Sequence, residues 1–212
     1  MIAALRGLHI FAGALAFVVA PVVLASAKGG KVHRLWGKIY FWAMAFVALS
    51  ALILAAVRPT LFLALVSVFS FYLSFSGYRI LVHKDGSGDW LDWTAALLTL
   101  GACVFFVMAA IFFPARIQNM QIPGIVFGTL GILSSGRSIS TFLRPGGPKM
   151  MWWYRHMGGM VGSYIAAWSA FSVNILSRYA GPQWWVWLWP TILGVPSLLL
   201  WIGYYRRRFA RV

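Results

Sequence analysis

Seven long apolar runs, separated by short polar or basic stretches, make up almost the whole chain. They cover residues 2–26, 33–57, 59–82, 91–113, 121–143, 151–177 and 184–205. Each is long enough to cross a hydrocarbon core of about 30 Å, which takes roughly 20 helical residues. The pattern predicts an all-α integral membrane bundle of seven transmembrane helices, forming a single domain over residues 1–212. Only Arg58 and Pro59 divide the second run from the third, so six helices are the alternative.

The composition agrees with a membrane protein and limits the chemistry. The 212 residues are 61% hydrophobic and only 10% charged, whereas about a quarter of the residues of a typical soluble domain are charged. Asp85, Asp89 and Asp92 are the only side-chain carboxylates, and the chain contains no Glu. Catalysis by paired carboxylates, or by a zinc site with a Glu base, is therefore disfavoured. We identify no catalytic constellation.

Positive charge is distributed unevenly over the two sets of run ends. One set holds four basic residues: Arg6, Arg58, Arg116 and Arg178. The other holds thirteen: Lys28, Lys31, Arg34, Lys38, Arg79, Lys84, Arg144, Lys149, Arg155, Arg206, Arg207, Arg208 and Arg211. Because Lys and Arg concentrate in cytoplasmic loops, we expect an inner (plasma) membrane protein with its N-terminus outside and its C-terminus in the cytoplasm.

The first run has a second interpretation as a secretory signal. It is apolar, follows Arg6 and ends in the small residues Ala25-Ser26-Ala27, which is typical of a cleavage site. The basic residues directly after it resist export, so we expect a retained helix.

The net charge of +15 predicts partners of opposite charge. No basic block stands apart from the apolar runs, so we expect the charge to meet the headgroups of anionic lipids in the bilayer and not nucleic acid.

With this orientation, three of the four histidines lie near the cytoplasmic ends of the runs. His33 opens the second run, His83 closes the third and His156 enters the sixth, whereas His9 lies in the outer half. Arginines and tyrosines reach the same depth: Arg79, Arg137, Arg155, Tyr40, Tyr78 and Tyr154. We predict a cytoplasmic-side pocket for an anionic or redox ligand, with these candidate binding residues: His33, His156, Arg137, Arg79, Arg155, Tyr78, Tyr154 and His9.

His33 and His156 form the central pair of this prediction. Each has a glycine nearby, Gly37 and Gly159, that would leave room for something flat or bulky. We therefore expect the two side chains to face one another, or a common ligand, between the second and sixth helices. A b-type haem, with the two neutral imidazoles as axial ligands of its metal, is one candidate cofactor. Two interfacial imidazoles bonded to lipid headgroups or backbone are the alternative.

Small residues form stripes on two further runs. They are Ser67, Ser70, Ser74 and Gly77 on the third run, and Gly124, Gly128, Gly131, Ser135 and Ser138 on the fifth. Such stripes let helix backbones approach closely in a bilayer, so we expect the third, fifth and sixth helices at the centre. A small-solute or lipid transporter lined by these residues is one alternative function, and a structural subunit of a larger membrane complex is another.

Arg137 is a charge well inside the fifth run. Such a side chain can face a buried anion or carbonyl cluster, or it can reach the cytoplasmic headgroups with its long stem. Both interpretations remain open from the sequence.

Asp89 and Asp92 stand at the expected start of the fourth helix. A carboxylate there can accept hydrogen bonds from the free N–H groups of the first turn, and the helix dipole favours negative charge at that end. We expect capping and not catalysis from these residues.

Several short motifs together resemble a known family. They are His9 with Gly13, HRLWGKIY from His33, LDW from Leu91, and HMGGMVGSYIAAWSAF from His156. The chain resembles a bacterial family of small polytopic inner-membrane proteins that is known only as a domain of unknown function. The resemblance implies seven helices and brings no reaction, substrate or cofactor. It favours as site residues His9, His33, Arg34, Gly37 and His156.

Overall fold

The computed structural model describes residues 1–57, 60–114, 120–148, 150–181 and 183–209. These residues form seven α-helices and no strand: α1 (Ile2–Ala25), α2 (Lys31–Val57), α3 (Leu61–Arg79), α4 (Trp90–Phe112), α5 (Gln121–Leu143), α6 (Met151–Ala180) and α7 (Trp184–Phe209). All seven are long and apolar enough to span a membrane. The predicted all-α transmembrane bundle is confirmed.

The division between the second and third predicted runs is a true helix boundary. α2 ends at Val57 and α3 begins at Leu61, so the six-helix alternative is wrong. Four basic residues of the charge count lie outside the described residues: Arg58, Arg116, Lys149 and Arg211.

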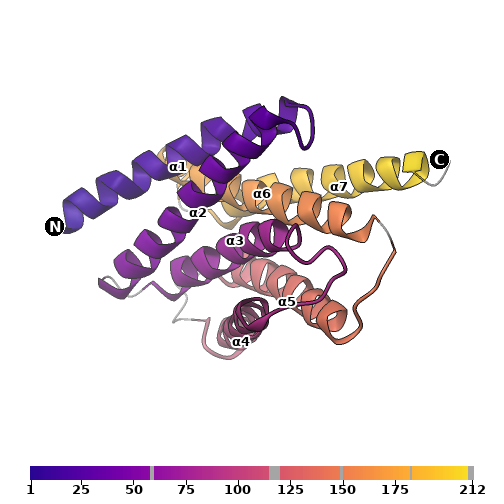
Figure 1. Cartoon of the computed structure of the whole chain (residues 1–212). Helices are drawn as coiled ribbons and strands as arrows, with labels where there is room; N and C mark the ends of the chain where they lie inside the picture. Colours follow the sequence, from indigo (N-terminus) through magenta and orange to yellow (C-terminus); the bar gives the residue numbers. More distant parts are fainter. Residues whose placement is uncertain (58–59, 115–119, 149, 182, 210–212) are drawn as a thin grey trace.

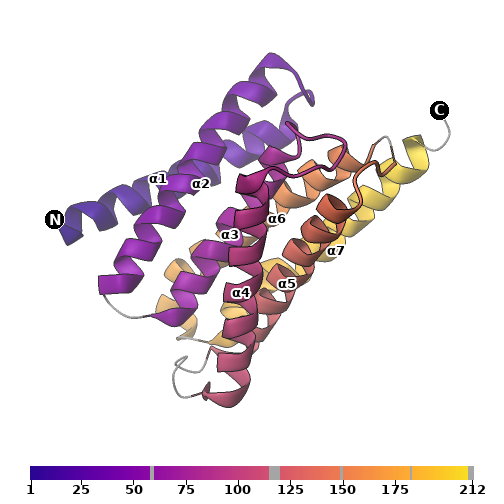
Figure 2. The ribbon, with the colours of Figure 1, turned by 60° about the horizontal axis from the view of Figure 1, so that its bottom comes forward.

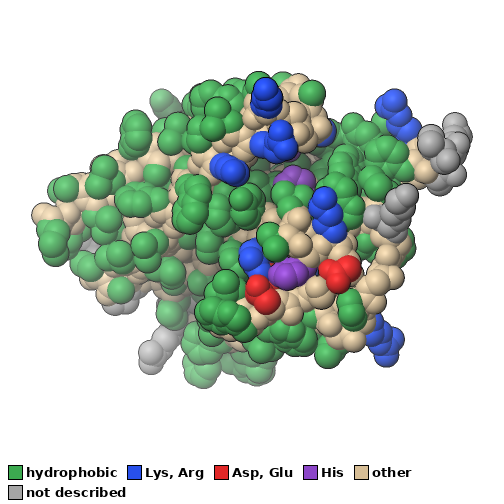
Figure 3. Space-filling view, viewed as in Figure 1, with side chains coloured by type: hydrophobic (Ala, Val, Ile, Leu, Met, Phe, Trp, Pro, Cys, Tyr) green, Lys and Arg blue, Asp and Glu red, His purple; other side chains and the backbone are tan. Residues whose placement is uncertain are grey.

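Successive helices run up and down, so that one end of the bundle carries the α1–α2, α3–α4 and α5–α6 connections together with the C-terminus (Figures 1 and 2). We call this end the basic end. Charged side chains and histidines gather towards it, whereas the opposite half of the same face is hydrophobic (Figure 3). The assignment of the basic end to the cytoplasm remains a prediction from the charge count.

α3 lies at the centre of the bundle, in extended contact with α2, α4, α5 and α6. Four helices close a ring, because α1 packs on α2, α2 on α3, α3 on α6 and α6 on α1. α2 and α6 are therefore diagonal in this ring, and they are not among the extensively packed pairs of the described residues. α5 and α6 each contact α3 but also lack extended contact with one another, so the expected centre of helices three, five and six is only partly formed.

The small residues produce the close contacts expected of them. Gly77 of α3 lies against Gly159 of α6 so closely that a Cβ on Gly159 would come within 2.6 Å of the Leu73 carbonyl oxygen. On α5, Gly128 and Gly131 also leave no room for a Cβ, because the side chains of Val107 and Cys103 of α4 occupy that space. Backbone contact without side chains is how helices associate where no hydrophobic effect drives them together. The contact between α3 and α6 fixes the depth at which His156 of α6 meets the end of α3.

Candidate functional site

His156 projects from the first turns of α6 towards the last turn of α3. Its Nδ1 lies 2.8 Å from the carbonyl oxygen of Gly77. That oxygen belongs to a helix end and lacks its usual partner, because the N–H of Leu81 bonds the oxygen of Tyr78 at 3.1 Å instead. A carbonyl only accepts, so Nδ1 of His156 carries the proton and donates it. The neutral ring then keeps a free lone pair on Nε2.

His33 makes the corresponding bond at the end of α1. Its Nδ1 lies 3.2 Å from the carbonyl oxygen of Val23 and 3.4 Å from the hydroxyl of Ser26, which itself donates to Val23 at 2.8 Å. Basic side chains commonly satisfy the last carbonyls of a helix in this way. Here too the proton sits on Nδ1, and Nε2 has no hydrogen-bond partner among the described residues.

The two imidazoles meet across the diagonal of the four-helix ring. Their ring centres are 6.2 Å apart and their planes are inclined by 68°. Because a bond from a metal to an imidazole nitrogen is about 2 Å long, two imidazoles at this separation are close enough to bind one metal ion in common. A backbone carbonyl on the second ring nitrogen is also the usual support of a metal-ligating histidine, because it fixes tautomer and orientation.

A packed layer closes the bundle beyond the two histidines. Tyr40 of α2 and Ser163 of α6 are hydrogen-bonded through their hydroxyls at 2.7 Å, and both are buried. Met160, one turn from His156, packs on the same cluster, which α1 completes with Ala16 and Val19. Gly37, one turn from His33, has no atom within 4 Å of the position that a Cβ would take. The Cβ position of Gly37 is therefore free of neighbours, whereas the layer of Tyr40, Met160 and Ser163 is closely packed.

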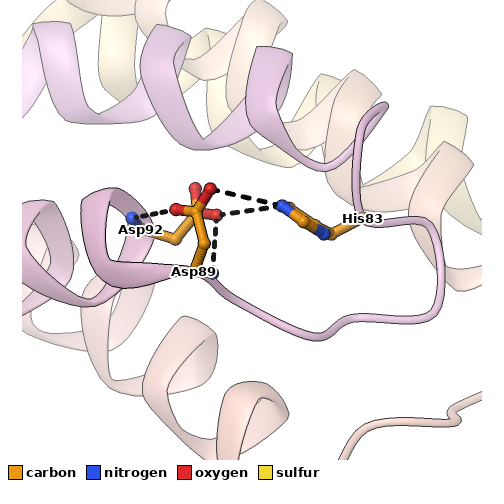
Figure 4. A group of neighbouring side chains, drawn as sticks. All are labelled: His83, Asp89 and Asp92. Atoms are coloured by element: carbon orange, nitrogen blue, oxygen red, sulfur yellow. Dashed lines mark hydrogen bonds and ion pairs between the residues drawn. The ribbon is translucent and has the colours of Figure 1, made fainter.

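Arg79 belongs to a separate cluster on the other side of α3. Its guanidinium lies 2.9 Å from Oδ1 of Asp92 and 2.5 Å from Oδ2 of Asp89, and His83 Nε2 lies 3.5 Å from Asp89 (Figure 4). His83, Asp89 and Asp92 could by distance hold a metal ion. The guanidinium already occupies the cation position between the two carboxylates, so we interpret the cluster as an ion-paired helix start.

The two carboxylates also cap α4, as the sequence predicts. Asp89 accepts hydrogen bonds from the backbone N–H groups of Leu91 and Asp92, and Asp92 accepts one from that of Asp89. This reciprocal arrangement is a capping box.

The environment of Asp89 keeps its carboxylate ionised. Burial raises its pKa, but hydrogen bonds from the Asp92 backbone and the Arg79 guanidinium outweigh burial and lower the pKa to about 2. An unfolded Asp has a pKa of about 3.9. The contribution of ionised Asp89 to stability is therefore complete above about pH 4 and is lost as the pH falls towards 2.

Replacing Arg79 by Leu is expected to destabilise the protein strongly. The change leaves two carboxylates without their cation, and Asp92 is only 6% exposed. Loss of one partner of a buried ion pair costs about 3–5 kcal/mol, and the 19% exposure of Arg79 places the expected cost near the lower end. The thermal midpoint of the purified variant in detergent measures it. Arg208→Leu, at an exposed position of α7, is the control, and equal midpoints for the two variants would contradict the prediction.

The remaining predicted site residues do not join the histidine pair. Arg137 is exposed on α5, which favours the interpretation that its stem reaches the headgroups. Nδ1 of His9 lies 2.8 Å from the hydroxyl of Ser50. His9 is in the first half of α1, whereas His33 of α2 lies against the last turn of α1. The other contacts are Tyr78 stacked on Phe41, Tyr154 under Arg206, and Arg155 bonded to Ser138.

Sequence reasoning missed two residues that line a cavity with Arg155, namely Tyr72 and Ser138. Ser138 belongs to the small-residue stripe of the fifth run, which was the signal that could have indicated it. Tyr72 lies about 160° around α3 from Ser70 and Ser74, so the stripe of the third run gave no signal for it.

Comparisons with protein-family models, with curated proteins and with solved structures find no match to this chain. The fold defines a multi-pass membrane protein.

Proposed function

We propose that this membrane protein binds one b-type haem between His33 and His156 and serves in one-electron transfer at the cytoplasmic side of the membrane. The observation that carries the proposal is the matched pair of imidazoles. Each ring has its Nδ1 on a helix-end carbonyl, and the ring centres are 6.2 Å apart. Bundles build cofactor sites from side chains on facing helices, and α2 and α6 face one another across the ring.

The chain's own residues would hold and tune the site. The carbonyl oxygens of Val23 and Gly77 orient the two rings and increase the basicity of the free nitrogens. The contact of Gly77 with Gly159 holds α6 at the depth where His156 reaches α3. The packed layer of Tyr40, Met160 and Ser163 would keep water from reaching the two histidines through the interior of the bundle. A haem bound here would supply an iron that accepts and releases one electron.

A purely structural role for the two histidines is the competing interpretation, because both rings satisfy helix-end carbonyls. A helix-end donor needs only one nitrogen and no partner across the bundle. The approach of two such donors from diagonal helices favours a common ligand. The transporter alternative has less support, since Ser135 and Ser163 are fully buried and each bonds a carbonyl of its own helix.

The absorption spectrum of the purified protein tests the proposal. Protein from haem-replete cells is expected to show a Soret band and, after reduction, the sharp visible bands of a low-spin iron with two nitrogen ligands. Extraction of the pigment should give close to one haem per chain. A colourless preparation would reject the haem, and the histidine pair would then be interpreted as helix-end donors.

A further inference from the structure

Arg155 and His156 are neighbours on α6 but point to different sides of α3. Nη2 of Arg155 donates to the hydroxyl of Ser138 on α5 at 2.9 Å. Nη1 of Arg155 is buried and has no hydrogen-bond partner in the described part of the chain. The same is true of the hydroxyl of Tyr72 on α3, whose residue is 3% exposed. Two buried donors from two helices are therefore unsatisfied in one place.

Both groups line one small cavity between α3, α5 and α6. Ser138 lines it too, and on the side of the basic end it is bounded by Arg79, His83 and Asp92. The cavity has a volume of about 20 Å³. A water molecule needs about 10–15 Å³ of such space, so the cavity has room for one water molecule or one monatomic ion.

Arg155 has no carboxylate partner among the three Asp side chains of the chain. Asp89 and Asp92 are both bound by Arg79, and Asp85 accepts its bonds from Ser87. Arg155 is half-buried and its Nη1 is fully buried, and a charged group that is removed from water without a partner is costly. Ser138 offers Arg155 a lone pair but no charge, because a hydroxyl is neutral. The proton of this hydroxyl is donated to the carbonyl of Ser134.

We propose that this cavity binds one small monovalent anion of the halide type, held by Nη1 of Arg155 and the hydroxyl of Tyr72. An anion accepts hydrogen bonds from both groups and also neutralises the charge of Arg155. A water molecule can accept the hydrogen bonds, but it leaves the charge without a partner. Asp92 faces the same space, and Arg79 neutralises it. The anion ties α3 to α6 on the side of α3 away from the histidine pair, so the site is independent of the haem proposal.

Thermal unfolding in different salts tests the proposal. The full-length protein in detergent is compared in sodium gluconate, chloride and bromide at constant ionic strength. We expect the midpoint to rise with halide concentration and to saturate, because an anion that binds only the folded state stabilises it. Arg155→Gln and Tyr72→Phe are expected to lose this rise, and Arg208→Gln is expected to keep it. Anomalous scattering from crystals grown in bromide should give a peak between Arg155 and Tyr72.

Three results would overturn the proposal: midpoints that do not distinguish halide from gluconate, a halide effect that both cavity variants retain, or a bromide-free cavity that holds only water. If Arg155→Gln does not fold, Tyr72→Phe decides, since it keeps the ring, the packing and the charge of Arg155. If neither variant can be purified, the bromide peak in the wild-type protein decides.

Discussion

A His156→Asn variant is expected to purify without haem while its fold is kept. The amide nitrogen of Asn stands close to where Nδ1 of histidine stands, so it can still donate to the carbonyl oxygen of Gly77. Nε2 is lost, and with it the proposed ligand to the iron. Loss of a residue that merely supports a metal ligand costs about 10–100-fold in affinity, so loss of a ligand itself should reduce haem content by more than tenfold. His33→Asn is expected to behave in the same way at Val23.

His9→Asn is the matched control for this pair. His9 also bonds through Nδ1, to Ser50, and lies near the other end of α1. The absorbance ratio of haem to protein, measured on monodisperse samples with equal thermal midpoints, gives the result. Full haem content in both His33→Asn and His156→Asn would reject the site. Haem loss in His9→Asn alone would move the site to the opposite end of the bundle.

The sequence predicts the helices of this protein well because their cause is local. A run of about 20 apolar residues has to cross the bilayer with its backbone groups paired, and a helix does this without any partner. Predicted and observed helix ends accordingly differ by only a few residues. The largest differences lie at polar ends such as Arg206 to Phe209, where α7 continues beyond the apolar run.

The predicted layer of His, Arg and Tyr shows where sequence reasoning stops. Position along a transmembrane helix gives the depth of a residue, but it does not give the side of the bundle that the residue faces. His33, Arg79 and Arg155 share a depth, yet the structure gives them separate partners, on α1, α4 and α5 respectively. The pairing of helix-end carbonyls with imidazoles depends on which helices are neighbours, and no pattern within one helix contains that information.

Arg137 is a case in which the sequence held more information than depth. The packed face of α5 follows the stripe that ends in Ser135 and Ser138, and both are buried. At about 100° per residue, Arg137 lies roughly 100° from Ser138 and 200° from Ser135. The stripe therefore already directs Arg137 away from the packed face, in agreement with its exposure.

A Gly159→Ala variant is expected to lose much of its stability, whereas Gly158→Ala should not. A Cβ on Gly159 would stand 2.6 Å from the Leu73 carbonyl oxygen and 2.7 Å from the Cα of Gly77. Both obstacles are backbone atoms, so no side chain can rotate away and α6 has to move off α3. Overpacking of this kind typically costs about 1–3 kcal/mol. On Gly158 a Cβ meets nothing within 4 Å, and Ala favours the helix over Gly by up to about 1 kcal/mol.

The same displacement should be visible at the histidine pair. If α6 moves off α3, the bond from His156 to Gly77 lengthens and the ring loses the carbonyl that orients it. We therefore expect Gly159→Ala to lower both the thermal midpoint and the haem content, and Gly158→Ala to leave both unchanged or slightly raised. Equal midpoints for the two variants would show that α3 and α6 do not approach as closely as Gly77 and Gly159 allow. A lowered midpoint with full haem content would separate the helix contact from the orientation of His156.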